Sequence, residues 1–244
     1  MDNSRIRILG RRILDFFFAR HCIGCGMPLL NGSGYRYICH RCLGEIDWIR
    51  HYFCPRCSAP DIENPQKEGC SNCKKLNFSF KCNRSLYVYA GVGRKMIHEL
   101  KYRNGHYLLP DIGRLSGEIS MQLDDALLVP VPLHWRRLWA RGFNQSELIC
   151  RHLTKFHRCK ICHLLRRSKH TSQQVGLCIA KRRENVDGAF KINHRLLKKN
   201  NLAKNQKIVL VDDVFTTGST LQACASELVD HGFSNIETFT LARA

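Results

Sequence analysis

The sequence contains no apolar run of the roughly 20 residues that a membrane-spanning helix needs. It also lacks a secretory signal, because the apolar cluster at residues 13–18 is short, contains Asp15 and has no small-residue cleavage site after it. Apolar positions within residues 5–20 recur at helical spacing, which predicts an amphipathic helix that packs on the rest of the protein. A helix lying on a membrane surface is the alternative. We therefore expect a cytoplasmic protein whose cysteines are reduced.

Acidic residues are scarce: 20 Asp and Glu stand against 39 Lys and Arg, so the net charge is +19. The imbalance is strongest in residues 134–207, which hold nineteen Lys or Arg and only the acids Glu147, Glu184 and Asp187. A basic face that simply stays solvated is one interpretation. The other is a positive potential that attracts a polyanion, either a small phosphorylated ligand or nucleic acid. Composition does not distinguish between these two ligands.

Cysteine is abundant, with fourteen residues, and eight of them form four Cys-x-x-Cys pairs separated by 13, 11 and 12 residues. In a reducing compartment, two-residue gaps favour metal knuckles over disulfides. Tetrahedral zinc takes four thiolates, so eight predict two structural zinc sites that leave no position open for a catalytic water. The predicted ligands are Cys22, Cys25, Cys39, Cys42, Cys54, Cys57, Cys70 and Cys73.

These four pairs can be combined into two sites in more than one way. Pairing in chain order, first with second and third with fourth, is the simplest, and a cross-braced arrangement stays open. Cys159 and Cys162 make a fifth Cys-x-x-Cys pair, but no partner pair follows them. We interpret this fifth pair as ordinary thiols.

Beyond the cysteine pairs, short apolar runs alternate with helical periods, which predicts a mainly parallel sheet flanked by helices. With 244 residues and 44% hydrophobic content, the chain is long enough for one α/β domain and a small extra module. Strands are expected at residues 86–90, 126–131, 161–165, 208–211 and 236–243, and helices at residues 94–102, at about 108–122 and after residue 220. Gly105 and Gly232 suit helix ends, and residues 193–206 suit a polar loop.

Residues 208–211 form an apolar run rich in β-branched side chains, which is typical of a strand buried on both faces. Asp212 and Asp213 follow it, and then comes a turn made of Thr216, Thr217, Gly218, Ser219 and Thr220. Gly218 permits the positive φ of a phosphate cradle, and the helical period after the turn places it at a helix N-terminus, where an anion is favoured. Simple capping of that helix is the alternative, but capping does not require two adjacent carboxylates beside the crevice of an α/β sheet.

This run resembles the 5-phosphoribosyl-1-pyrophosphate (PRPP) signature of type I phosphoribosyltransferases, in which an apolar strand is followed by Asp-Asp and Thr-Thr-Gly-Ser-Thr. The resemblance implies that Asp212 and Asp213 hold the ribose hydroxyls, that residues 216–220 bind the 5-phosphate, and that Mg²⁺ bridges the pyrophosphate. We expect the acidic pair to bind the sugar and not to hold a metal tightly. No stretch is identified that would read a nucleobase.

A second pair of motifs narrows the resemblance. Pro-Val-Pro-Leu at residues 130–133, followed by Arg-Gly-Phe-Asn-Gln at residues 141–145, resembles the ComF family of competence-associated phosphoribosyltransferase-like proteins, which also carry an N-terminal Cys-x-x-Cys zinc module. In that family this segment lies on the pyrophosphate side, which makes Arg137, Arg141 and Asn144 candidate PRPP contacts. A role in capping or solvating the helix start is the alternative for each.

In phosphoribosyltransferases the corresponding place carries a mobile flap that closes over the pyrophosphate. The ComF-like pattern Arg-x-x-x-Thr-x-x-Gln-x-x-Leu can be laid on Arg167, Thr171, Gln174 and Leu177, and Arg182 and Asn185 match the rest. Arg167, Gln174 and Arg182 therefore join the candidate PRPP contacts. Closure would exclude water from an oxocarbenium-like transition state.

Together the motifs predict a type I phosphoribosyltransferase fold in residues 84–244, after an amphipathic helix and a small zinc-binding module in residues 1–83. The ComF resemblance implies a protein that binds PRPP and acts in natural transformation by handling imported single-stranded DNA, with other competence proteins such as a helicase as partners. We favour an enzyme with an unknown acceptor. The alternatives are a non-catalytic competence factor that binds single-stranded DNA and a PRPP-responsive regulator. With no ordered series of stacking aromatics, DNA binding should be sequence-independent and salt-sensitive.

Overall fold

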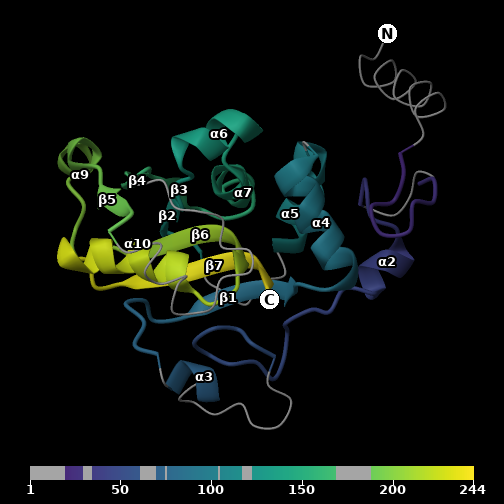
Figure 1. The fold of residues 1–244 in the computed structure, drawn as a ribbon, viewed down its shortest axis with the longest axis horizontal. Helices are drawn as coiled ribbons and strands as arrows, with labels where there is room; N and C mark the ends of the chain where they lie inside the picture. The colour runs from purple at the N-terminus through teal and green to yellow at the C-terminus, as the bar shows by residue number, and fades with distance from the viewer. Residues whose placement is uncertain are drawn as a thin grey trace.

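The computed structural model describes residues 20–29, 35–60, 70–74, 76–103, 105–116, 123–168 and 188–244. Its centre is a parallel five-stranded sheet with the strand order β1-β7-β6-β2-β3 (Figure 1). The strands are β1 Asn83–Val88, β2 Leu127–Pro130, β3 Lys160–Ile161, β6 Ile208–Phe215 and β7 Ile236–Arg243. A separate antiparallel pair is formed by β4 Leu165–Arg167 and β5 Phe190–Ile192. The predicted α/β class with a mainly parallel sheet is confirmed.

Helices cover both faces of this sheet. On one face pack α4 Gly91–Tyr102, α5 Leu109–Ser116 and α7 Gln145–Leu153, and on the other packs α10 Ser219–Asp230. The remaining helices are α2 His40–Gly44, α3 Ser71–Lys74, η1 Gly105–Leu108, α6 Trp135–Arg141 and α9 His194–Asn200. None of the helices in the described ranges is long and apolar enough to cross a bilayer, and the helix predicted at residues 5–20 falls almost wholly outside those ranges.

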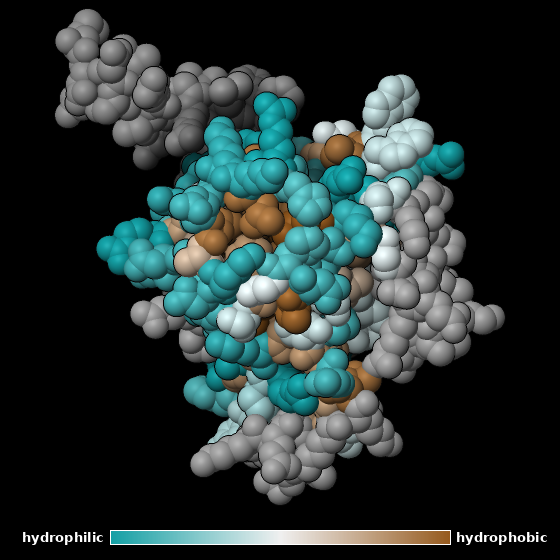
Figure 2. All heavy atoms as spheres, turned by 90° about the vertical axis from the view of Figure 1, so that its left-hand side faces the viewer, coloured by the Kyte–Doolittle hydropathy of each residue, from teal (hydrophilic) through white to brown (hydrophobic). Residues whose placement is uncertain are grey.

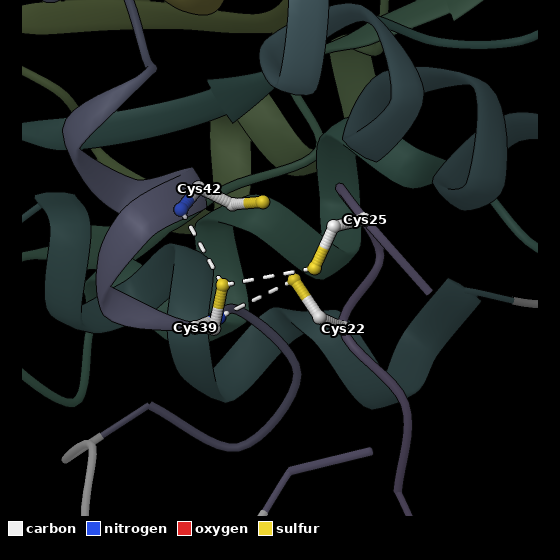
Figure 3. Close-up of side chains that lie close together, drawn as sticks. All are labelled: Cys22, Cys25, Cys39 and Cys42. Atoms are coloured by element: carbon white, nitrogen blue, oxygen red, sulfur yellow. Dashed lines mark hydrogen bonds between the residues drawn. The ribbon is translucent and has the colours of Figure 1, made fainter. Parts of the chain in front are cut away.

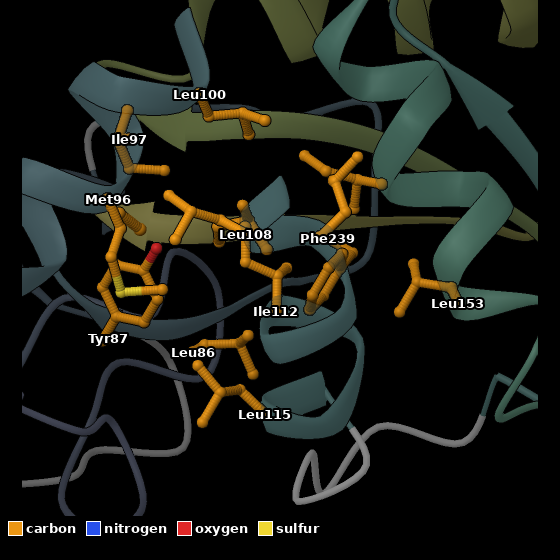
Figure 4. Packing of buried hydrophobic residues seen from close by; sticks show 14 of the residues in the cluster. Leu86, Tyr87, Met96, Ile97, Leu100, Leu108, Ile112, Leu115, Leu153 and Phe239 are labelled. Atoms are coloured by element: carbon orange, nitrogen blue, oxygen red, sulfur yellow. The ribbon is translucent and has the colours of Figure 1, made fainter. Parts of the chain in front are cut away.

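The core is built on both sides of β6, as its continuous apolar run predicts. Val209 and Val211 pack with the α4, α5 and α7 cluster, whereas Ile208 and Leu210 pack with the α10 cluster, and all four are fully buried. Figure 4 shows the first cluster, in which side chains of α4 and α5 converge around Phe239 of β7. The apolar half of β6 is thus buried on both faces, and the candidate site lies toward the carboxyl end of the strand.

The two neighbours of β6 end at different heights, and we call the region beyond the end of β2, beside residues 212–215 of β6, the crevice. β7 pairs with β6 as far as Phe215, but β2 stops at Pro130, opposite Val211. The chain leaves β2 toward β3 through α7, and it leaves β6 toward β7 through α10 on the opposite face. Two adjacent strands whose connections leave on opposite faces form a topological switch point, which is where α/β sheets bind ligands. The prediction that the acidic pair ends the strand is corrected, because the β7 ladder continues past both residues.

Three local predictions were wrong. Residues 161–165 do not form one strand, since β3 ends at Ile161 and Leu165 begins β4, which pairs with β5. Residues 193–206 are not all loop, because α9 forms there. Its two leucines are half-buried, and its Lys and Arg side chains are exposed. Gly105 does not cap α4; it begins η1, and a Cβ there would lie 2.7 Å from the backbone of Glu99.

The cysteine-rich region is not a detached domain, because it packs along the edge strand β1 (Figure 1). Backbone N–H groups of Ile49 and Asn83 donate to the carbonyls of Leu86 and Arg56, at 2.9 and 2.8 Å. This covering satisfies backbone groups that an open sheet edge would expose. The domain boundary at residues 83/84 remains our proposal.

Candidate functional site

Two groups of four cysteines assemble in chain order: Cys22, Cys25, Cys39 and Cys42 in one, and Cys54, Cys57, Cys70 and Cys73 in the other. Within each group the sulfurs lie within 4.8 Å of one another, and the Sγ–Sγ distance is 3.8 Å both for Cys25–Cys39 and for Cys57–Cys70 (Figure 3). Tetrahedral Zn–S bonds of about 2.3 Å place sulfurs roughly 3.8 Å apart. Both groups therefore fit zinc, and pairing in chain order is confirmed.

The two clusters repeat the same supporting contacts. The backbone N–H of Cys39 donates to Cys22 Sγ at 3.3 Å, and the N–H of Cys70 donates to Cys54 Sγ at 3.2 Å. Such N–H···S bonds stabilise thiolates and orient them for a metal. Gly24 lets the first knuckle close, because a Cβ there would meet the Cys42 sulfur at 2.5 Å.

A buried carboxylate attaches the first cluster to the sheet domain. Asp111 of α5 is only 1% exposed, and its two oxygens accept three hydrogen bonds of 2.8–3.0 Å from the backbone N–H groups of Arg36 and Tyr37. Charge-assisted bonds of this kind are stronger than neutral ones. The segment between the cysteine pairs of the first cluster is thus held against the helices that cover the sheet.

At the end of β6 the two adjacent aspartates have different environments. Asp213 is buried, and its oxygens contact Lys101 Nζ and Gln145 Nε2, both at 2.8 Å. Asp212 is half-buried, and its Oδ1 accepts from Ser146 Oγ at 3.0 Å and from the Asp213 N–H at 2.9 Å. Within the described ranges Asp212 Oδ2 accepts no hydrogen bond. Asp213 therefore belongs to the framework, whereas Asp212 keeps one carboxylate oxygen available for a ligand.

The electrostatics of this pair follow from its burial. Burial first, and the neighbouring negative charge of Asp213 second, raise the pKa of Asp212 to about 7, while Lys101 and the hydrogen bonds from Asp213 and Ser146 oppose the shift. Burial alone would lower the pKa of Lys101, but the carboxylates of Asp213 and Asp212 outweigh it and raise that pKa. Lys101 thus stays charged, and Asp212 changes its charge near neutral pH.

The loop after the acidic pair has an open helix N-terminus. Gly218 occupies the N-cap of α10 with φ of +76°, and it has no side chain to cap the first-turn N–H groups. A Cβ on Gly218 would lie 2.6 Å from the Phe215 ring, so the tight turn also requires glycine. Arg243 Nη1 steadies the loop by donating to the carbonyls of Phe215 and Thr216, at 3.2 and 3.1 Å. The Ser219 N–H donates to Thr217 Oγ1 at 3.4 Å, and the N–H groups that follow it, together with the helix dipole, suit a phosphate.

Three of the predicted arginines lie near this crevice. Arg141 Nη1 donates to Gln145 Oε1 at 3.2 Å, and its guanidinium lies 5.3 Å from the centre of the Tyr102 ring. Burial first, and the positive charge of Arg141 second, lower the pKa of Arg137. Burial, and then the charge of Arg137, likewise lower the pKa of Arg167. The arginines repel one another, and a bound polyanion would relieve that repulsion.

Asn144 has a structural function in this arrangement. Its Oδ1 caps α7 by accepting from the Ser146 N–H at 3.0 Å, and its Nδ2 donates to the Val131 carbonyl at 3.0 Å. These bonds fix the Pro-Val-Pro wall of the crevice to the helix that carries Gln145. A contact between Asn144 and pyrophosphate stays a prediction.

The predicted flap is described only at its base. Gln174 and Arg182, together with Thr171, Leu177 and Asn185, lie outside the described residues. At the base, Arg167 belongs to β4, which pairs with β5. Glu227 of α10 accepts from the Ile192 N–H at 2.9 Å and pairs with Lys191 at 3.2 Å. The base of the predicted flap is therefore anchored to α10, the helix that follows the predicted phosphate loop.

Sequence reasoning missed four residues of the site: Lys101, Gln145, Ser146 and Arg243. Gln145 and Ser146 lie in or directly after the Arg-Gly-Phe-Asn-Gln motif, so the motif itself was a signal that α7 begins at the site. Lys101 is in the last turn of α4 and Arg243 ends β7, and nothing in their local sequence indicates a contact with β6.

Comparisons with known proteins agree with this geometry. Residues 13–74 match a family model described as a double zinc ribbon domain, and residues 150–244 match a phosphoribosyl transferase domain. The DNA utilization protein YhgH of Escherichia coli strain K12 is 28% identical over 232 residues, which cover 91% of this chain and 96% of that protein. Competence protein F of Haemophilus influenzae is 27% identical over 230 residues (86% and 98%), and competence protein ComFC of Bacillus subtilis is 26% identical over 218 residues (85% and 84%). The predicted fold and zinc-ribbon module are confirmed.

Proposed function

Because this chain is a homologue of the ComF proteins that joins a double zinc ribbon to a phosphoribosyltransferase domain, we propose that it binds PRPP and acts in competence, in the handling of imported single-stranded DNA. A cytoplasmic, reducing location is part of the proposal, since it keeps the cysteine thiols available for zinc.

One observation carries the proposal: among the described residues Asp212 keeps one carboxylate oxygen without a hydrogen bond, and it lies six residues before Gly218, the N-cap of α10, which has no capping side chain. PRPP presents a 5-phosphate, vicinal hydroxyls and a pyrophosphate. The loop of residues 216–220 would bind the phosphate, and Asp212 would accept from a hydroxyl. Arg137, Arg141 and Arg167 would lie toward the pyrophosphate, with Gln174 and Arg182 added by the flap. Asp213 would act through Lys101 and Gln145, which it positions.

The acidic pair is poorly suited to hold a metal by itself. Asp213 is already neutralised by Lys101, and among the described residues only the cysteine clusters bring three or more potential ligands together. Mg²⁺ would therefore be held mainly by pyrophosphate oxygens and water, and would neutralise charge on the leaving group. The carboxylate of Asp212 would favour the positive charge that develops on the sugar ring.

Calorimetry with PRPP and Mg²⁺, followed by a pyrophosphate-release assay with candidate acceptors, tests this proposal. Binding with release supports a transferase, and binding without release by any acceptor supports a PRPP-responsive regulator. A chain that binds DNA but not PRPP would contradict the proposal and leave a non-catalytic DNA-binding factor.

The basic surface supports the DNA part of the proposal. Arg195, Lys198 and Lys199 of α9 are exposed, and Figure 2, which views the molecule from this side, shows hydrophilic side chains around a smaller apolar area. Phosphate contacts by such residues release counterions, so affinity for single strands should fall steeply as salt rises. Binding that is unchanged between low and moderate salt would show that this charge is not the contact surface.

A further inference from the structure

Helix α6 is the most exposed element beside the candidate site, and the PRPP proposal uses only one of its faces. No residue of α6 is buried, although its ends are well defined by the His134 N-cap and by Gly142, whose φ is +75°. Arg137 and Arg141 are half-buried and belong to the site. The other face carries Trp135, Leu138 and Trp139, which are 62%, 42% and 90% exposed.

Such a face requires an explanation, because an exposed aromatic cluster marks a binding surface more often than chance exposure. Residues four apart on a helix lie on the same side, so Trp135 and Trp139 present two large rings together. Their helix is rigid at its start, where His134 Nδ1 accepts from the Arg136 N–H at 3.3 Å. The sequence shows no ordered series of stacking aromatics, but exposure and helical spacing bring out one pair, Trp135 and Trp139.

The charge of α6 indicates the occupant. Its seven residues include three arginines and no acid, and the Arg136 guanidinium lies 5.2 Å from the centre of the Trp135 ring. A chain that pairs flat aromatic faces with regularly spaced negative charges matches this surface, and single-stranded nucleic acid has both features. An apolar protein segment would match the rings but not the arginines.

We propose that the α6 face formed by Trp135, Leu138 and Trp139 is a stacking platform for the bases of single-stranded nucleic acid, with Arg136 at the phosphate backbone. The inference rests on the DNA-handling part of the proposed function and deepens it, because it names one helix as the site that contacts the bases. Because Arg137 and Arg141 belong to the same helix and the proposed function assigns them to PRPP, a strand on the platform would lie beside the PRPP site.

The test compares two ligands of about 15 units, an oligothymidylate and an abasic phosphodiester of the same length. The wild-type chain should bind the oligothymidylate at least about tenfold more tightly, as stacking of even one base predicts. In the Trp135→Leu, Trp139→Leu double variant, affinity for the oligothymidylate should fall to that for the abasic chain, with affinity for the abasic chain unchanged. Leucine keeps the surface apolar, so only ring stacking is removed.

Three controls keep the result interpretable. Trp139→Phe retains a ring and should keep most of the preference, and Tyr52→Ala removes an aromatic that is 68% exposed in the cysteine-rich region and should change nothing. Calorimetry with PRPP should be the same in every variant, which shows that the fold is intact. A double variant that still prefers the oligothymidylate overturns the inference alone and leaves α6 to a protein partner. A wild-type chain that binds neither ligand overturns the DNA-handling proposal together with it.

Discussion

Asp212 and Asp213 are adjacent and chemically identical, but the fold gives them different functions. Asp213 forms a buried pair with Lys101, whereas Asp212 uses only Oδ1 in hydrogen bonds with the described residues. Removing one partner of a buried pair leaves the other charge uncompensated. Asp213→Asn should therefore lower the free energy of unfolding by roughly 1–3 kcal/mol, a moderate value because Asp212 stays near Lys101. Asp212→Asn should leave it unchanged or slightly higher, since the repulsion between the carboxylates is removed. Urea denaturation measures the free energy of unfolding of both variants. An equal loss in the two would contradict this division of functions between the aspartates.

The pH dependence of binding reports on Asp212. Its pKa is about 7 in the folded chain, far above the ordinary value of about 4 in an unfolded chain. Its contribution to stability is therefore fully present below about pH 4 and is lost as the pH rises through 7. Ligand binding runs the other way, because a ribose hydroxyl donates best to the ionised carboxylate. PRPP affinity should rise by up to about tenfold per pH unit up to pH 7. Calorimetry at several pH values measures this, and Asp212→Asn separates it from titration of the ligand's own phosphates. The same pH profile in wild type and variant would contradict the assignment.

Gly218 and Gly232 provide a matched pair at the two ends of α10. Both have positive φ, +76° and +86°, but a Cβ on Gly218 would strike the Phe215 ring, whereas one on Gly232 would make only ordinary contact with Lys204 at 3.5 Å. Alanine at either position would have to adopt a left-handed backbone conformation, which destabilises the fold by about 1–2 kcal/mol. At Gly218 the clash with the ring adds about 1–3 kcal/mol. We expect Gly218→Ala to lose PRPP binding and Gly232→Ala to keep it. Denaturation and calorimetry of both variants check this, and equal PRPP affinities would argue against the loop as the phosphate site.

Among the elements, those defined by short-range patterns could be predicted from the sequence. The apolar run of β6, the turn at Gly218 and the spacing of the cysteine pairs each lie within a few residues, and each formed as expected. Contacts that join distant segments could not be predicted. The bonds from Arg36 to Asp111 and from Gln145 to Asp213 join residues 75 and 68 positions apart, and no local pattern encodes them. Helix α9 was missed because, apart from two half-buried leucines, its side chains are polar and mostly basic.

The zinc ribbons should respond to mutation as two separate units. Cys54→Ser removes one thiolate from the second cluster, so the zinc content should fall from about two ions per chain to about one, because the cysteines of the first cluster are all intact. Stability should fall as well, since Arg56 in the same knuckle bonds to Asn83 of β1. Cys82→Ser is the control, because Cys82 lies outside both clusters. Metal analysis that finds no zinc in the wild type, or thiol titration that finds disulfides, would end this account.

Seen whole, the molecule separates its structural and binding regions. The cysteine clusters cover the β1 edge of the sheet, whereas the acidic pair, the phosphate loop and the arginines meet around β6 and β2, beside α6. The chain has a net charge of +19, and of the two aspartates at the crevice one is already paired with Lys101. A multiply charged anion with a sugar between its charges fits this arrangement.

Calorimetric titration of the wild-type chain and of Asp212→Asn with PRPP, in the presence of Mg²⁺, tests this central claim most directly. Ribose 5-phosphate and pyrophosphate, titrated separately, serve as fragments of the ligand. The wild type should bind PRPP more tightly than either fragment. Asp212→Asn should weaken PRPP by about tenfold or more, as expected for a lost hydrogen bond to a charged group, and should leave pyrophosphate unaffected. Equal PRPP affinity in the two proteins, or wild-type binding no tighter than that of pyrophosphate alone, would contradict the account.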